Sequence, residues 1–176
     1  MNIVSSPHDK YFRQIFSSKA EMTDLILNGL PSVAKHIELD SLELDSTTYI
    51  DKKLGTNYSD LVYDCMYKKK IRIKIALLFE HKSNVVTIPE LQLLGYMLKI
   101  WETNIKQQKK LMPVIPILFY HGKEELEKKP FLDNFEGQDE FIQRYLPSFE
   151  YESINTHKFT DTQIKQLFSL ASVKIS

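Results

Sequence analysis

Apolar and polar residues recur along the chain with two different periods. Over residues 8–30 apolar side chains are spaced three and four apart in two runs, which predicts a helix in two pieces that ends near Gly29. From residue 37 the spacing shortens towards two. Residues 37–50 are therefore predicted to form one or two strands, with a break near Asp40.

The next segment predicts a β-hairpin. Tyr58–Tyr67 is rich in β-forming residues, the lysines at 68–70 form a polar turn, and Ile71–Phe79 alternates apolar and charged side chains. The last four residues of this second strand are apolar on both faces, so we expect it to lie in the middle of a sheet.

A helix and a further strand follow. Thr87 and Glu90 have the spacing of a capping box, which predicts a helix that starts at Thr87. Val114–Tyr120 predicts an apolar strand at a sheet edge or with a bulge, because Pro116 cannot donate a ladder hydrogen bond. The predicted buried stripe of the helix is Leu91, Leu94, Leu98, Trp101 and Ile105.

Beyond residue 122 the pattern weakens. It predicts a strand at Ser148–Ile154 and a short helix at Asp161–Ala171. The order of elements indicates a mixed α/β fold with an antiparallel portion. We expect one domain over residues 1–176, with 123–176 as its less certain part.

Composition narrows the class of protein. The chain has 176 residues, 43% of them hydrophobic, which fits one soluble domain. No apolar stretch approaches the roughly 18 residues that span a bilayer, and the polar start is unlike a signal peptide, so we expect no membrane partner. The single cysteine, Cys65, excludes an internal disulfide and favours a cytoplasmic protein. Only five glycines occur and none forms a phosphate-binding loop, which argues against kinases and dinucleotide-binding enzymes.

The charges are balanced in number but not in position. Lys and Arg together number 23, as do Asp and Glu, and the net charge is zero. Residues 46–123 nevertheless carry thirteen basic and six acidic side chains, a net +7, between two acidic flanks. This segment is a candidate surface for a polyanion, and an ordinary solvated face is the alternative interpretation.

Two carboxylates of the predicted hairpin are candidates for a metal site. If the lysine turn centres on residue 70, Asp60 lies directly opposite Glu80, and Lys82 shares their face. A slip of one residue would separate them. Carboxylates that close repel unless a cation lies between them, and Mg²⁺ prefers oxygen ligands. A lysine beside such an ion suits phosphodiester hydrolysis. A cross-strand salt bridge is the alternative interpretation.

Two residues of the following helix extend this candidate site. Gln92 and Tyr96 are four residues apart and lie off the predicted apolar stripe, so they share one helix face. We expect them either to point towards the strand end that carries Glu80 or to form a solvated flank of the helix.

These residues resemble a known nuclease pattern. Asp60, then Glu80-His81-Lys82, then Gln92 through Tyr96, is similar to the PD-(D/E)XK motif with its trailing Q-x-x-x-Y. The wider context resembles one branch, the recombination-promoting nucleases, also described as YhgA-like transposases. The further matching stretches are 8–12, 58–63, 77–83, 96–101 and 114–122, so the resemblance covers about residues 8–122.

The resemblance implies a fold and an activity. It implies a restriction-endonuclease-like α/β core, with a mixed β-sheet flanked by helices, that cuts DNA with Mg²⁺ or Mn²⁺. Asp60, Glu80 and the backbone carbonyl of His81 would bind the metal. The implied catalytic residues are Asp60, Glu80, Lys82, Gln92 and Tyr96, with Lys82 acting on the attacking water and the last two supporting the site or the DNA backbone.

Three departures from the family pattern affect these expectations. Ser59 replaces the proline of the motif, and Lys82 stands where many relatives carry glutamine. Relatives are often longer, so we expect either a trimmed C-terminal region or a short form, and we leave a homodimer open. A catalytically inactive DNA- or protein-binding module, which regulates a longer relative, is the alternative function.

Basic residues outside the motif are candidates for DNA contacts. They lie in the lysine turn, in the strand after it and at the end of the helix: Lys68, Lys69, Lys70, Arg72, Lys74, Lys106, Lys109 and Lys110. The alternatives are a solubilising turn and cations that favour a helix C-terminus.

Overall fold

The structure is a computed structural model of the chain. It describes residues 7–47, 49, 59–81, 88–121 and 128–156, and for residues 7–9, 59, 60 and 81 it describes the backbone alone. The helices and strands are α1 (Pro7–Phe16), α2 (Lys19–Gly29), α3 (Pro31–Ala34), β1 (Ile37–Leu44), β2 (Ser59–Tyr67), β3 (Ile71–His81), α4 (Pro89–Lys106), β4 (Val114–His121), η1 (Phe131–Asn134), α5 (Glu140–Gln143) and β5 (Glu152–Asn155).

The strands form one mixed sheet in the order β1-β2-β3-β4-β5. β1, β2 and β3 are antiparallel neighbours, whereas β4 runs parallel to β3 and β5 runs parallel to β4. The mixed α/β fold and the central position of β3 are therefore confirmed. A strand inserted parallel to its neighbour needs a crossover, and α4 makes the crossover between β3 and β4.

The predicted edge position of β4 is wrong. β4 lies between β3 and β5, and its pairing with β3 is regular throughout. Pro116 is tolerated because β5 pairs only with residues 117–120 of β4, so on that side the missing N–H breaks no ladder bond.

The predicted break in the first strand is a bulge. The pairing of β1 with β2 shifts register between Glu38 and Glu43. The hydroxyl of Ser41 bridges the bulge, because it donates to the carbonyl of Glu38 at 2.6 Å and accepts from the N–H of Met66 at 2.8 Å. A bulge of this kind bends an edge strand and satisfies its polar groups locally.

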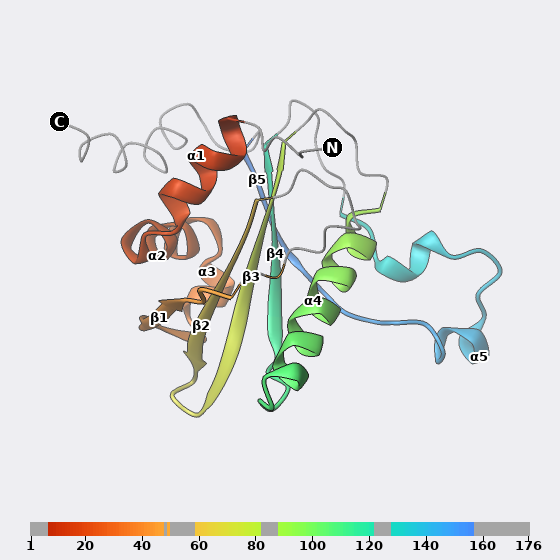
Figure 1. Ribbon diagram of the computed structural model, residues 1–176. Coiled ribbons are helices and arrows are strands. Elements are labelled where there is room, and N and C mark those ends of the chain that lie inside the picture. Colours follow the sequence, from red (N-terminus) through yellow and green to blue (C-terminus); the bar gives the residue numbers. More distant parts are fainter. Residues whose placement is uncertain (1–6, 48, 50–58, 82–87, 122–127, 157–176) are drawn as a thin grey trace, which may run out of the picture.

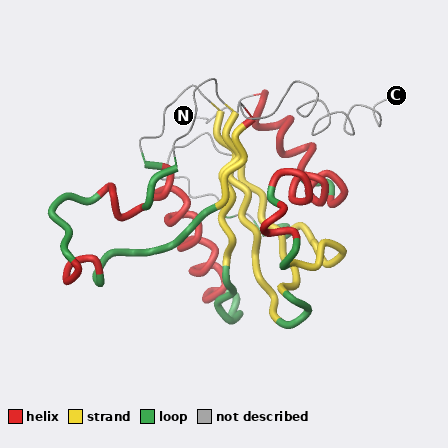
Figure 2. Tube along the Cα trace, turned by 180° about the vertical axis from the view of Figure 1, so that it is seen from behind, coloured by secondary structure: helices red, strands yellow, loops and turns green. Residues whose placement is uncertain are grey.

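Helices cover both faces of the sheet. α1, α2 and α3 pack on one face and α4 on the other, so that the sheet stands between them in both views (Figures 1 and 2). In the core on the α1 side, the rings of Phe12 and Phe79 are stacked with their centroids 4.2 Å apart, and the rings of Phe12 and Phe119 are tilted with their centroids 5.2 Å apart. The hydroxyl of Tyr63 in β2 donates to the carbonyl of Phe16 at the end of α1, which ties that helix to the sheet.

The predicted buried stripe of α4 is wrong. The helix buries Leu93, Met97 and Ile100, whereas Leu91 and Leu98 are 53% and 50% exposed. α4 is apolar over a wide arc, and both candidate stripes have helical spacing. Only the position of Leu78 and Leu118 beneath the helix decides which stripe packs.

The start of α4 also differs from the prediction. The helix begins at Pro89 with Ile88 as its N-cap, and no side chain caps it. Thr87 lies outside the described residues. Glu90 is buried, and its carboxylate accepts a 3.4 Å hydrogen bond from the hydroxyl of Tyr151.

The segment after β4 extends away from the sheet on the side of α4 and returns as β5 (Figure 1). β5 spans Glu152–Asn155 and is shorter than the predicted strand. The predicted helix at 161–171 lies outside the described residues. None of the described helices is long and apolar enough to cross a membrane.

Candidate functional site

The register of the β2–β3 hairpin differs from the predicted register by two residues. Tyr67 pairs with Ile71, so the turn centres on residue 69, and Asp60 pairs with Leu78 rather than with Glu80. Because the shift is even, strand alternation still puts the positions of Asp60, Leu78 and Glu80 on one face. Asp60 and Glu80 are therefore diagonal neighbours on adjacent strands, a position at which Cα atoms are about 7–8 Å apart.

Glu80 lies at the carboxyl end of β3 and is buried, with 4% of its surface exposed. Its face is the α4 face, since Leu78, two residues before it, packs with Leu93 of α4. Burying a carboxylate is costly unless partners or a ligand stabilise it. Glu80 therefore marks this strand end as the candidate site.

The parallel register aligns two further buried residues with Glu80. Tyr120 of β4 pairs with Glu80, and Asn155 of β5 pairs with Tyr120, so the three form a row across the carboxyl ends of the parallel strands. Asn155 is 6% exposed and Tyr120 is 7% exposed. Neither was among the predicted site residues, because the predicted last strand stopped at Ile154 and Tyr120 was predicted only as the last residue of an apolar strand. The signal for each was a polar or aromatic residue at the end of an apolar strand.

α4 brings Gln92 and Tyr96 towards this end of the sheet. Tyr96 packs against the cluster that includes Val62 and Ala76, a pair that lies two residues along each strand from the pair of Asp60 with Leu78. Gln92 lies one helical turn further towards the carboxyl end of β3, which is about 5.4 Å, and its side-chain oxygen is buried. Gln92 and Tyr96 are both half-buried, so this helix face is not a fully solvated flank.

Two motif residues are described in part or not at all. His81 ends β3 in register with His121 of β4. The ring of His121 is bonded to the hydroxyl of Thr156 at 2.9 Å, also at the carboxyl edge. Lys82 lies outside the described residues.

The residue types at this edge fit a hard divalent cation. Asp60 and Glu80 offer oxygen donors, which Mg²⁺ and Mn²⁺ prefer over nitrogen or sulfur. A buried amide, Asn155, lies in the same row. Within the described part of the chain, no cluster of three or more His, Cys, Asp and Glu side chains forms a ready-made metal cage.

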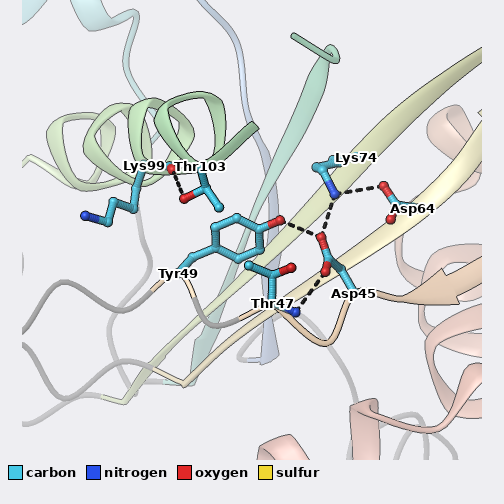
Figure 3. A network of polar contacts seen from close by, with 7 residues as sticks. All are labelled: Asp45, Thr47, Tyr49, Asp64, Lys74, Lys99 and Thr103. Carbon is cyan, nitrogen blue, oxygen red and sulfur yellow. Dashed lines mark hydrogen bonds and ion pairs between the residues drawn. The ribbon is translucent and has the colours of Figure 1, made fainter. Parts of the chain in front are cut away.

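Lys74 is not a surface contact for DNA, contrary to the prediction. It is 1% exposed, and its ammonium lies 2.6 Å from a carboxylate oxygen of Asp45 and 2.8 Å from one of Asp64 (Figure 3). The hydroxyl of Tyr49 donates to the same Asp45 carboxylate at 2.5 Å. Strand alternation alone could not show that Lys74 points inwards, beneath the chain that follows β1.

The pKa values of this network reflect its contacts. Burial alone would raise the pKa of Asp45, but hydrogen bonds from Lys74, Tyr49 and Thr47 outweigh burial and hold it well below its ordinary value. Burial opposes the charge on Lys74, yet its bonds to Asp45 and Asp64 raise its pKa above the ordinary value. Lys74 lies six residues from Glu80 along β3, about 20 Å at ~3.3 Å per residue, so the network is separate from the Glu80 edge.

The other predicted DNA-contact residues are exposed, but they lie at the wrong end of the sheet for direct contact with Glu80. The exposed residues are Lys68, Lys69, Lys70, Arg72, Lys106, Lys109 and Lys110. The β2–β3 turn and the C-terminal end of α4 lie together at one end of the sheet, and the carboxyl end of β3 lies at the other (Figure 1).

Cys65 faces the opposite side of the sheet from the candidate site, as predicted from strand alternation. It belongs to the core beneath α1 and α2, and burial raises the pKa of its thiol to about 12. A thiol with that pKa stays protonated at neutral pH and is a poor nucleophile.

The fold and this edge together define a class: an α/β protein with a mixed sheet and a polar site at the carboxyl ends of its parallel strands, where such sheets bind ligands. The chain belongs to the family described as "Putative transposase, YhgA-like", which matches residues 6–175. The resemblance inferred from the sequence is therefore confirmed. No solved structure matches the chain.

Three relatives illustrate the relationship. Recombination-promoting nuclease RpnD of Escherichia coli O157:H7 is 30% identical over 121 residues, 67% of this chain and 46% of RpnD. Recombination-promoting nuclease RpnA of E. coli K12 is 27% identical over 122 residues, 68% of this chain and 41% of RpnA. Inactive recombination-promoting nuclease-like protein RpnE of the same strain is 28% identical over 139 residues, 78% of this chain and 45% of RpnE. The chain thus spans less than half the length of these relatives.

Proposed function

We propose that this chain is a metal-dependent DNA endonuclease with a restriction-endonuclease-like core, which hydrolyses phosphodiester bonds and promotes DNA recombination or mobility. The observation that carries the proposal is the buried Glu80, on the same sheet face as Asp60 and beneath the helix that holds Gln92 and Tyr96. Kinship with proteins named recombination-promoting nucleases supports it.

The proposed cofactor is Mg²⁺ or Mn²⁺, held by Asp60, Glu80 and the backbone carbonyl of His81. When bound, the ion supplies charge neutralisation at the scissile phosphate. Glu80 suits this role because its burial keeps competing water away and strengthens electrostatic interactions.

Three side chains complete the proposed site. Lys82 follows Glu80 by two residues, positions the attacking water and stabilises charge that develops on the phosphate. Gln92 orients a site residue or a phosphate oxygen through its amide. Tyr96, packed on Val62 and Ala76, holds the helix face in place.

Cleavage of supercoiled plasmid DNA with Mg²⁺ tests the proposal. Asp60→Asn, Glu80→Gln and Lys82→Ala are each expected to lower the cleavage rate by about 100-fold or more, and EDTA to abolish cleavage. Glu43→Gln is the matched control, because it removes an exposed carboxylate on β1 and should leave the rate unchanged.

The opposite result would identify the alternative function. One relative is named an inactive nuclease-like protein, and this chain is 28% identical to it. If wild type and all three variants give the same trace of nicking, the enzyme proposal fails. A DNA- or protein-binding module that regulates a longer relative then takes its place.

A further inference from the structure

The end of the sheet opposite Glu80 carries a cluster of exposed basic residues from two separate segments. We call this cluster the basic end. One part is the β2–β3 turn with the start of β3, and the other is the last turn of α4 with the residues after it. Its members are Lys68, Lys69, Lys70, Arg72, Lys106, Lys109 and Lys110.

Two facts bring these segments together. The N–H of Lys74, four residues after the turn, donates to the carbonyl of Pro113 at 2.8 Å, and Lys74 pairs with Val114 at the start of β4. Both segments also lie at the same end of the sheet in the front and back views (Figures 1 and 2). A single ligand can therefore contact both.

The backbone of the turn gives an independent reason to assign a function to its lysines. Lys68 and Lys69 have φ values of 47° and 56°, and the N–H of Lys70 donates to the carbonyl of Tyr67 at 2.9 Å. This is a type I′ turn, whose two central positions strongly prefer Asn-Gly because both require positive φ. Lysine is strained there, and the contact that the Lys68 ammonium makes beside the turn is with the ring of Tyr67, 5.1 Å from its centroid.

The second segment shows the same feature. The N–H groups of Gln108 and Lys109 donate to the carbonyls of Ile105 and Asn104, which is a Schellman motif with Gln108 at the left-handed position. Glycine is the usual residue there. Of the described non-glycine residues, Lys68, Lys69 and Gln108 are those with positive φ, so all the left-handed strain outside glycine falls at the basic end.

We propose that the basic end binds the phosphate backbone of duplex DNA, away from the cleavage site. Backbone strain that the fold does not require clusters at functional surfaces. Here the strained positions, Lys68 and Lys69, carry ammonium groups at a tight turn. Lysines neutralise phosphates as point charges and need no fixed geometry, which suits sequence-independent contacts. The choice of DNA over another polyanion rests on the proposed function.

The test exchanges the strained lysines for the residues that the turn prefers. Binding of wild type and of Lys68→Asn/Lys69→Gly to a labelled duplex of about 20 base pairs is measured at several salt concentrations, with Ca²⁺ replacing Mg²⁺ to prevent cleavage. The variant is expected to bind more weakly, and the slope of log affinity against log salt is expected to shrink by about two. Its Tm should rise by about 2–4 °C, because the strain is relieved.

The matched control removes two exposed basic residues that lie outside the basic end. Lys10→Gln/Arg144→Gln removes two exposed cations, makes the same change in net charge and should leave the slope near that of wild type. A smaller slope for the turn variant together with a stable fold supports the proposal, since loss of structure is then excluded.

Other outcomes overturn it. An unchanged slope for the turn variant, or a wild type that does not bind the duplex, would refute the DNA surface. If the turn variant keeps the wild-type slope for DNA but binds phosphatidylserine-containing vesicles more weakly than wild type, the DNA surface is also refuted, and the basic end is then assigned to a membrane surface. The two proposals can fail separately, because binding is measured without cleavage. If wild type binds DNA through the basic end but cleaves nothing, only the endonuclease proposal is refuted. If wild type cleaves DNA but the turn variant has the same salt slope as wild type, only the proposal for the basic end is refuted.

Discussion

At the scale of single residues, the buried ammonium of Lys74 shows how burial changes the role of a side chain. In the sequence it is one of several lysines near a turn. In the structure it joins the segment after β1 to β2 and β3 through two carboxylates, and Tyr49 extends the network to Tyr96 by a ring contact at 6.3 Å. The network thus anchors the segment after β1 against β2 and β3.

Removing this cation should strongly destabilise the protein. Lys74→Met is expected to lower the free energy of unfolding by about 3–5 kcal/mol at pH 7, because it leaves Asp45 and Asp64 without their counter-charge in a partly buried site. Urea unfolding measures the loss. Lys99→Met, on the half-buried side of α4, is the matched control and should cost much less.

The loss of unfolding free energy in Lys74→Met should become smaller as the pH falls. In wild type the pKa of Asp45 is lower in the folded protein than in the unfolded chain, where it is about 4. Asp45 therefore stabilises the folded state fully above about pH 4, and this contribution is lost only as the pH falls below that value. In Lys74→Met the Asp45 carboxylate has lost its counter-charge and takes up a proton at higher pH than in wild type, which removes its unfavourable buried charge. The difference in unfolding free energy should therefore narrow between pH 7 and pH 4, and a constant difference would contradict this account.

At the scale of elements, α4 has two apolar stripes of which one is buried. Leu93 contacts Leu78 and Leu118 in the core, whereas Leu98 is half exposed. Leu93→Ala should cost about 2–5 kcal/mol of unfolding free energy, and Leu98→Ala less than about 1 kcal/mol. Thermal or urea unfolding of the two variants measures both values, and equal costs would show that the outer stripe is also covered.

At the scale of the whole molecule, the basic end and the proposed cleavage site are separated by the length of β3. Ile71 and His81 are ten residues apart, which at ~3.3 Å per residue is about 33 Å, close to one turn of a DNA duplex. One duplex can therefore reach both ends only if it is about ten base pairs long or longer.

This separation predicts a dependence on substrate length. If the chain cleaves DNA, Lys68→Asn/Lys69→Gly should raise the KM for a long duplex and leave kcat unchanged, since the lost contacts bind substrate without touching the reacting phosphate. On a hairpin whose stem has about eight base pairs the variant should match wild type. Steady-state kinetics on both substrates measures this, and an equal fall of kcat on both would refute it.

The hairpin shows how far the sequence could predict the site. Strand alternation put Asp60 and Glu80 on one face, and this held because the real register differs from the predicted one by an even number of residues. The register itself was wrong, since it depends on a turn in which Lys68 and Lys69 adopt positive φ, and lysine carries no signal for that conformation. Asn155 was missed because it joins the site only through pairing with β4, far away in sequence.

By itself, the sequence determined the types and order of the longer helices and strands up to β4, the hairpin and the family, because local periodicity and motif spacing depend on neighbouring residues. The tertiary structure decided which stripe of α4 is buried, that Lys74 is enclosed by Asp45 and Asp64, and that the basic end lies a sheet's length from Glu80. Each of these depends on contacts between segments distant along the chain, and no local pattern encodes them.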